Sequence, residues 1–192
     1  MKNQTILIPE NPVSSFLFNN TRSAVIWLII RLYLGYAWIS AGWHKVTDPN
    51  WTGENAGASV AGFVHGALGK AAEGNVTGWY ASFLENFVLP NATAFSYLVA
   101  YGEVLVGLGL IVGLLTGIAA FFGSLMNVSF LFAGTLSTNP LLFILATWLV
   151  LAWKVAGWYG LDRWILPRFG TPWDRGKSIV MKSDTNGGKF NT

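Results

Sequence analysis

The chain has 192 residues, of which 53% are hydrophobic and only 11% are charged, with a formal net charge of +3. A soluble domain carries roughly 25% charged residues, so this composition predicts an integral membrane protein. The cations gather near the chain ends and form no single patch, which argues against nucleic-acid binding. The chain has no cysteine, and this excludes disulfides, thiol redox chemistry and iron–sulfur clusters.

Long apolar stretches dominate the sequence, and each is close to the ~20 residues that span a hydrocarbon core. There are four of them, at residues 23–43, 93–115, 117–136 and 140–160. We therefore predict an all-α membrane protein built as a four-helix bundle, with a tight corner at Thr116–Gly117. The same division leaves an N-terminal tail at 1–22, a connection at 44–92, and a basic, partly disordered tail at 166–192.

The 44–92 connection is too long for a bare loop. Val60, Phe63, Val64, Ala67, Leu68 and Ala71 recur at helical spacing, and so do Trp79, Tyr80, Phe83, Leu84 and Phe87 after a turn at Glu73–Asn75. We expect two short amphipathic helices that lie on the membrane surface or cap the bundle.

The distribution of basic residues predicts the orientation. The two tails carry eight cations, against two in the 44–92 connection: Lys2, Arg22, Arg163, Arg168, Arg175, Lys177, Lys182 and Lys189, against Lys45 and Lys70. The positive-inside rule then places both termini in the cytoplasm and the connection outside, in a multi-pass protein of the cell membrane.

Ionisable residues within spanning helices are costly and usually face the bundle interior with a partner. At 1.5 Å per residue, Arg31, Glu103 and Asn127 lie about 12, 18 and 15 Å from the inner ends of their helices. The sequence thus predicts one polar layer near the midplane, with Arg31 and Glu103 as an ion pair. This pair could only lock two helices together, or it could hold the head of an amphipathic small molecule. Asn127 alone is more typical of contacts between helices.

One face of the first helix carries Arg31, Gly35, Trp38, Gly42 and Lys45, at steps of three and four residues. Small residues on such a face admit either a neighbouring helix or a ligand, and Trp38 offers a flat wall. The glycines favour a helix seam. A ligand such as a quinone ring between the Arg31–Glu103 layer and Lys45 is the alternative.

The remaining polar candidates are weaker. Lys154 lies at about 9 Å depth, where its stem could reach the polar layer or snorkel to the headgroups. His44 could donate to a quinone carbonyl, or serve only as an interfacial residue. Neither His44 nor His65 sits at membrane depth, so haem is not expected, and no metal-ligand constellation is visible.

Several of these residues form a pattern that resembles the DoxX family. Its first part is Arg31, then Gly35 and Gly42–Lys45, and its second is Tyr101–Glu103 followed by Gly107, Leu110 and Gly113–Thr116. Gly157–Asp162 resembles the ending of the family's fourth helix. The match spans about residues 23–165.

The resemblance implies a four-helix membrane bundle, and it singles out Arg31, Lys45, Glu103 and Asp162 as motif positions. The chain is similar to DoxD, the small subunit of thiosulfate:quinone oxidoreductase, and to membrane subunits linked to oxidative-stress and quinone-detoxification systems. By this resemblance, we expect a membrane subunit that binds a quinone and works with a partner electron donor.

Three functions remain open from the sequence. In the first, an oxidoreductase subunit binds quinone, with Arg31 and Glu103 as the catalytic pair and Lys45, His44, Trp38, Asn127, Lys154 and Asp162 as ligand-binding candidates. The second is a non-enzymatic scaffold, or a lipid- or pigment-binding protein. The third is a small transporter, against which the lack of a visible inverted repeat argues. A homo-oligomer is compatible with all three.

Overall fold

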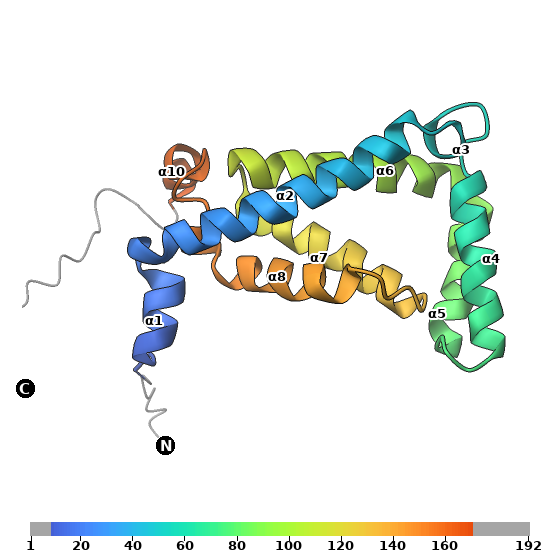
Figure 1. The fold of residues 1–192 in the computed structure, drawn as a ribbon, viewed down its shortest axis with the longest axis horizontal. Coiled ribbons are helices and arrows are strands. Elements are labelled where there is room, and N and C mark those ends of the chain that lie inside the picture. Colours follow the sequence, from blue (N-terminus) through green and yellow to red (C-terminus); the bar gives the residue numbers. More distant parts are fainter. Residues whose placement is uncertain (1–8, 171–192) are drawn as a thin grey trace, which may run out of the picture.

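A computed structural model describes residues 9–170, and this part of the chain is all-helical, without a strand. The longer helices run along one axis and the shorter ones cross its two ends (Figure 1). The α-helices are α1 (Pro12–Asn19), α2 (Ala24–Thr47), α3 (Pro49–Thr52), α4 (Ala58–Ala72), α5 (Gly78–Phe83), α6 (Ala92–Val112), α7 (Thr116–Phe132), α8 (Asn139–Leu151), α9 (Trp153–Ala156) and α10 (Asp162–Ile165). Four single turns complete the set: η1 (Thr21–Ser23), η2 (Leu84–Val88), η3 (Leu89–Asn91) and η4 (Leu166–Phe169).

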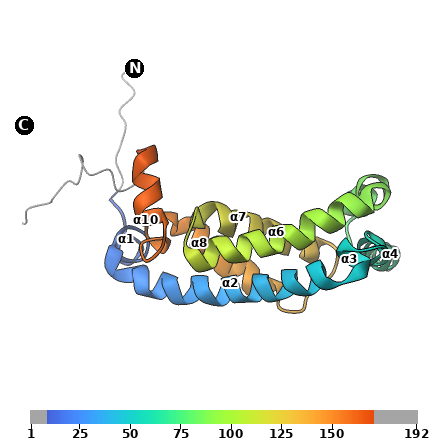
Figure 2. The same cartoon turned by 90° about the horizontal axis from the view of Figure 1, so that it is seen from above.

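Four helices, α2, α6, α7 and α8, alternate in direction along the long axis (Figures 1 and 2). Two helical stretches are long and apolar enough to cross a membrane: Thr21–Thr47, with 27 residues, and Gly78–Val112, with 35. Thr116–Phe132 and Asn139–Leu151 are apolar but shorter. The apolar segments predicted from the sequence are therefore helices.

The fourth predicted stretch, 140–160, differs from the structure. It is not one helix, because α8 ends at Leu151 and the single turn α9 follows after Ala152. The break at Ala152 redirects the chain, so that the backbone carbonyls of Ala156 and Tyr159 face α2.

The 1–22 tail contains a helix that sequence reasoning missed. Asn11 caps α1, since its side chain accepts from the amide of Val13, and Pro12 occupies the first turn. The indole nitrogen of Trp27 donates to the carbonyl of Leu17, which holds α1 against α2. Of the predicted basic tail, residues 171–192 lie outside the described residues.

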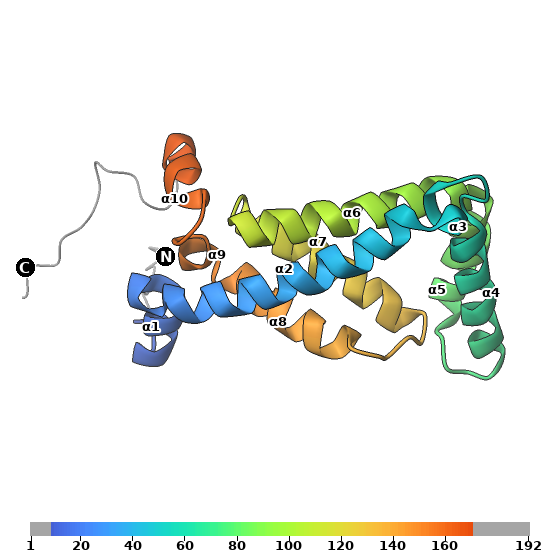
Figure 3. The same cartoon turned by 45° about the horizontal axis from the view of Figure 1, so that its top comes forward.

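The region from α3 to η3, residues 49–91, closes one end of the bundle and is called the cap here. Helices α4 and α5 stand across the bundle axis at the end opposite α1 and α10 (Figures 1 and 3). The predicted inward face of α4 is confirmed, because Val60, Val64 and Ala67 are buried. Trp79, in contrast, is 62% exposed.

Several side-chain hydrogen bonds anchor the cap to the bundle. The Tyr80 hydroxyl donates to the carbonyl of Ser129 at 2.8 Å, and Lys70 Nζ donates to the carbonyl of Gly134 at 2.9 Å. The Ser96 hydroxyl donates to the carbonyl of Trp51 at 2.7 Å. The cap is thus fixed to α6, to α7 and to the loop after α7.

Helices α2 and α6 form the closest seam. A Cβ on Gly107 would lie 2.7 Å from the amide nitrogen of Ile39 and 2.8 Å from the carbonyl oxygen of Gly35. On Gly42 it would lie 2.8 Å from the amide nitrogen of Val104. Because these atoms are backbone, only glycine lets the two helices approach this closely. The seam interpretation of the first-helix glycines is confirmed.

Candidate functional site

The predicted ion pair between Arg31 and Glu103 is wrong. Glu103 Oε2 accepts from Lys45 Nζ at 2.6 Å, and Arg31 instead donates to the carbonyl oxygens of Ala156 at 3.2 Å and Tyr159 at 2.9 Å. Within residues 9–170, Lys45–Glu103 is the only salt bridge.

The register of the antiparallel seam explains this difference. Gly42 faces Glu103 and Val104, and Arg31, about three turns earlier on α2, packs against Gly113 just beyond the end of α6. The start of α2 therefore projects about 12 Å past α6. Depths counted from each helix end treated those ends as level, which placed Arg31 wrongly beside Glu103.

Arg31 belongs to a structural junction at the α1–α10 end of the bundle. Its guanidinium is buried between Gly113 and Gly160, where any Cβ would collide with it. Asp162 is also fully buried and attracts this cation electrostatically. The glycines of the sequence pattern here make room for a charged side chain.

Asp162 secures the corner between α6 and α7. Its two carboxylate oxygens accept from the amides of Leu115 at 2.5 Å and Thr116 at 2.9 Å, at the start of α7. Leu115 has a φ of 47°, a left-handed conformation that is strained for a residue with a Cβ. The carboxylate thus stabilises a strained turn and a helix N-terminus together. The turn lies just before the predicted Thr116–Gly117 corner.

Lys45 and Glu103 line a large cavity toward the other end of the bundle. The volume of this cavity is about 610 Å³, and it lies between the α2–α6 pair, the α7–α8 pair and the cap. In Figure 3 the two helix pairs diverge toward the cap. The apolar wall includes Ala37, Ala41, Val60, Phe63, Leu84, Phe95, Met126, Phe130 and Leu142.

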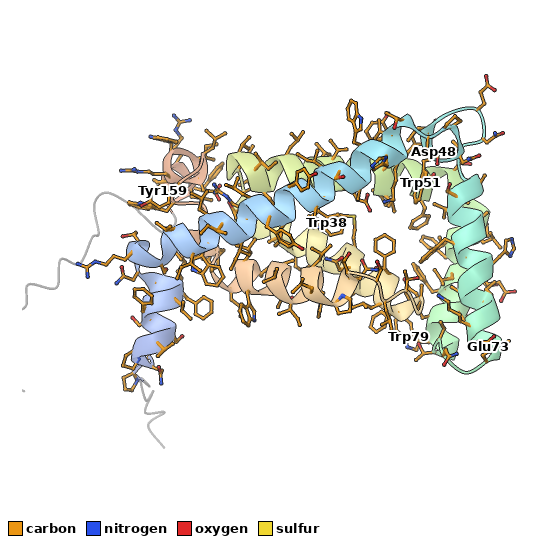
Figure 4. All side chains as sticks on the ribbon, viewed as in Figure 1. Trp38, Asp48, Trp51, Glu73, Trp79 and Tyr159 are labelled. Atoms are coloured by element: carbon orange, nitrogen blue, oxygen red, sulfur yellow. The ribbon has the colours of Figure 1, made fainter. Side chains whose placement is uncertain are left out.

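The ion pair in this wall is asymmetric. The Glu103 side chain is 1% exposed and that of Lys45 19%. The Lys45 ammonium also lies 5.1 Å from the centre of the Trp51 ring, within the range of a cation–π contact. Trp51 belongs to the cap (Figure 4). The Lys45 ammonium, on α2, therefore contacts both Glu103 of α6 and Trp51 of α3.

Two further polar side chains in the wall lack hydrogen-bond partners. Asn127 is 0% exposed and Trp38 is 3% exposed. Neither Asn127 Nδ2 and Oδ1 nor Trp38 Nε1 has a partner among the described residues. The interpretation of Asn127 as a hydrogen-bonded contact between helices therefore has no support. Of the three residues predicted to share a layer, Glu103 and Asn127 share this cavity and Arg31 does not.

The other candidates lie outside the cavity. His44 is exposed near the end of α2, and Lys154 is exposed and donates to Asn19 Oδ1 at 3.1 Å. Asp162 lies in the Arg31 junction. Among residues 9–170 no group of three or more His, Cys, Asp or Glu could hold a metal ion. Sequence reasoning missed the contribution of the cap, since Trp51, Val60 and Tyr80 become wall residues only when it folds over the bundle.

The all-helical fold of the described residues and its two long apolar helices point to a helical membrane protein. A family model called DoxX matches residues 26–136, more than half of the chain. The chain therefore belongs to the DoxX family, as its sequence pattern indicated. No curated protein and no solved structure matches it.

Proposed function

We propose that this protein is a four-span membrane subunit of an oxidoreductase system, which binds a quinone in the cavity beneath the cap. One observation carries the proposal: an apolar cavity of about 610 Å³ whose wall holds a buried ion pair and buried polar atoms without partners. Small-molecule sites occupy roughly 300–1,000 Å³ and combine apolar walls with a few convergent polar groups.

The residues of the wall fit a quinone. Its carbonyl oxygens are acceptors, and Trp38 Nε1, Asn127 Nδ2 and the Lys45 ammonium are donors on this wall. Aromatic and aliphatic side chains suit the ring and an apolar tail. Arg31 has no part in this proposal, because it lies in the junction at the far end of the bundle.

Reduction of a quinone to a quinol consumes two electrons and two protons. The chain has no cysteine, so the proposal assigns the electrons to a reduced partner protein that docks on this subunit. Lys45 and Glu103 form the one ionisable pair on the cavity wall, and it is suited to passing protons to a bound ring. In this assignment Glu103 and Lys45 are the catalytic residues.

The same proposal includes a topology with four passes and both ends in the cytoplasm. Helices α1 and α10 lie at one end of the bundle, as an even number of passes requires (Figure 2). The excess of Lys and Arg near these ends supports the orientation. A cysteine introduced at Asn75 should react with an impermeant thiol reagent from outside, whereas one at Asn20 should not. Labelling of Asn20→Cys from outside intact cells would overturn the orientation.

Titration with a short-tailed naphthoquinone tests the binding. Trp38 and Trp51 line the cavity, so binding should quench part of the tryptophan fluorescence of the protein in detergent, with saturation. Trp38→Phe should lose part of this quenching, while Trp43→Phe should not, since Trp43 is 62% exposed and outside the wall. A folded sample without saturable quenching would refute quinone binding.

The apolar wall also supports a second candidate, a lipid- or pigment-binding protein without redox chemistry. Solvent extraction of the protein purified from native membranes, followed by absorbance spectroscopy, separates the two. A co-purifying quinone supports the first function, and a carotenoid or a phospholipid in the cavity supports the second.

A further inference from the structure

The unpartnered atoms on the cavity wall have a chemical pattern that restricts the ligand. In residues 9–170, five buried side-chain atoms lack a partner, and three of them belong to Trp38 and Asn127. Burying such groups without partners is unfavourable. The side chains lie on different helices, Trp38 on α2 and Asn127 on α7, in the wall of one cavity.

Trp38 and Asn127 approach the same face of α7. A Cβ on Gly123 would lie 3.1 Å from Trp38 Nε1. Asn127 follows Gly123 by one helical turn, so it projects from the same side of the helix. The indole N–H and the amide therefore lie on the same side of α7, about one helical turn apart along it.

The hydrogen-bonding needs of the two groups differ. The indole N–H only donates, whereas the amide both donates and accepts, whichever way its oxygen and nitrogen are assigned. A quinone carbonyl can accept from both groups, but it leaves the amide oxygen unpaired. A hydroxyl on the ring can accept from the indole or the amide nitrogen and also donate to the amide oxygen.

We infer that the cavity recognises a hydroxylated ring, and that it binds the reduced quinol more tightly than the oxidised quinone. This inference rests on the proposed function and adds the redox form that the site selects.

The expected ratio of quinol affinity to quinone affinity follows from the unpaired amide oxygen of Asn127. Pairing one otherwise unsatisfied buried acceptor corresponds to about a tenfold difference in affinity. Tighter binding of the reduced form raises the midpoint potential of the bound couple, and a tenfold preference corresponds to about 30 mV for two electrons.

Calorimetric titration of one naphthoquinone and its quinol, the latter under anaerobic reducing conditions, tests the inference. The wild-type protein should bind the quinol about tenfold more tightly. Asn127→Leu should bring the two affinities together, because the acceptor is gone. Asn127→Ser, whose hydroxyl donates and accepts, should keep part of the preference and serves if the leucine variant does not fold.

Trp38→Phe is the matched control. Carbonyl and hydroxyl oxygens both accept from the indole N–H, so this variant should weaken both ligands by a similar factor and leave their ratio unchanged. Equal affinities in the wild-type protein, or a preference that survives Asn127→Leu, would overturn the inference while quinone binding stands. If neither form binds to the folded wild-type protein, the proposed function fails with it.

Discussion

The Lys45–Glu103 pair gives the sharpest test of the register between α2 and α6. Lys45→Met removes the cation and leaves the Glu103 carboxylate, 1% exposed, without its partner. Stranding a buried charge costs roughly 3–5 kcal/mol. We expect a loss near the lower value, about 3 kcal/mol, because the 19% exposure of Lys45 shows that water reaches this side of the pair.

Substitution of the other partner, Glu103, should lower the free energy of unfolding by less. In Glu103→Gln the amide oxygen can still accept from Lys45, and the ammonium retains its contact with the Trp51 ring. A loss of about 1–2 kcal/mol is expected. The double variant Lys45→Met with Glu103→Gln should be more stable than the sum of the single losses predicts, since no stranded charge remains.

Unfolding by sodium dodecyl sulfate in mixed micelles, followed by circular dichroism, measures these free energies. The control cycle combines Arg31→Gln with Glu103→Gln, which should be additive within about 0.5 kcal/mol because Arg31 lies at the other end of the bundle. Strong coupling between Arg31 and Glu103, with additivity for Lys45 and Glu103, would refute the register.

Other parts of the fold give further predictions, each measured by the same unfolding assay. Gly107→Ala should lose roughly 1–3 kcal/mol because its Cβ meets backbone atoms of α2, while Gly62→Ala, with nothing within 4 Å, should be neutral or stabilising; similar losses for both would contradict the seam. Asp162→Ala should cost about 2–4 kcal/mol, since two amides lose their acceptor, and Asp162→Asn, which keeps one acceptor, should cost about half; an unchanged midpoint for Asp162→Ala would exclude this role. Tyr80→Phe should cost about 1 kcal/mol by removing the bond to Ser129, and no loss would show that the bond does not hold the cap.

The helices were predictable because their signals are local. Apolar runs predicted α2, α6 and α7, and the spacing of Val60, Val64 and Ala67 predicted α4. The turn at Glu73–Asn75, before α5, was also predicted. It is confirmed, because Gly74 has a φ of 79°. There is no glycine or proline at the break at Ala152, so the local sequence does not predict that a helix ends there.

The partners of the buried charges were not predictable, because register is a property of two helices together. Counting depth from helix ends cannot reveal that the start of α2 projects about 12 Å beyond the end of α6. The backbone carbonyls that accept hydrogen bonds from Arg31 could not be predicted from the sequence either, since every residue has one. A signal did exist in Gly113 and Gly160, which belong to the sequence pattern but were not interpreted as making space for a guanidinium.

One end of the bundle holds a structural junction, and the other holds the candidate binding cavity. At the α1–α10 end, Arg31 Nη1 and Nη2 and the Asp162 carboxylate have hydrogen-bond partners that tie α2, α7 and the region from α9 to α10, while Arg31 Nε and Thr116 Oγ1 have none. At the cap end, Trp38 and Asn127 leave polar atoms unpaired, which costs free energy in the ligand-free protein. Proteins retain such unfavourable groups mainly at functional sites, where other interactions offset them. A ligand that pairs these atoms should therefore stabilise the protein by more than its apolar contacts alone provide. Quinol should accordingly raise the unfolding midpoint of the wild-type protein more than that of Asn127→Leu at equal ligand saturation, and equal shifts would show that the amide takes no part in binding.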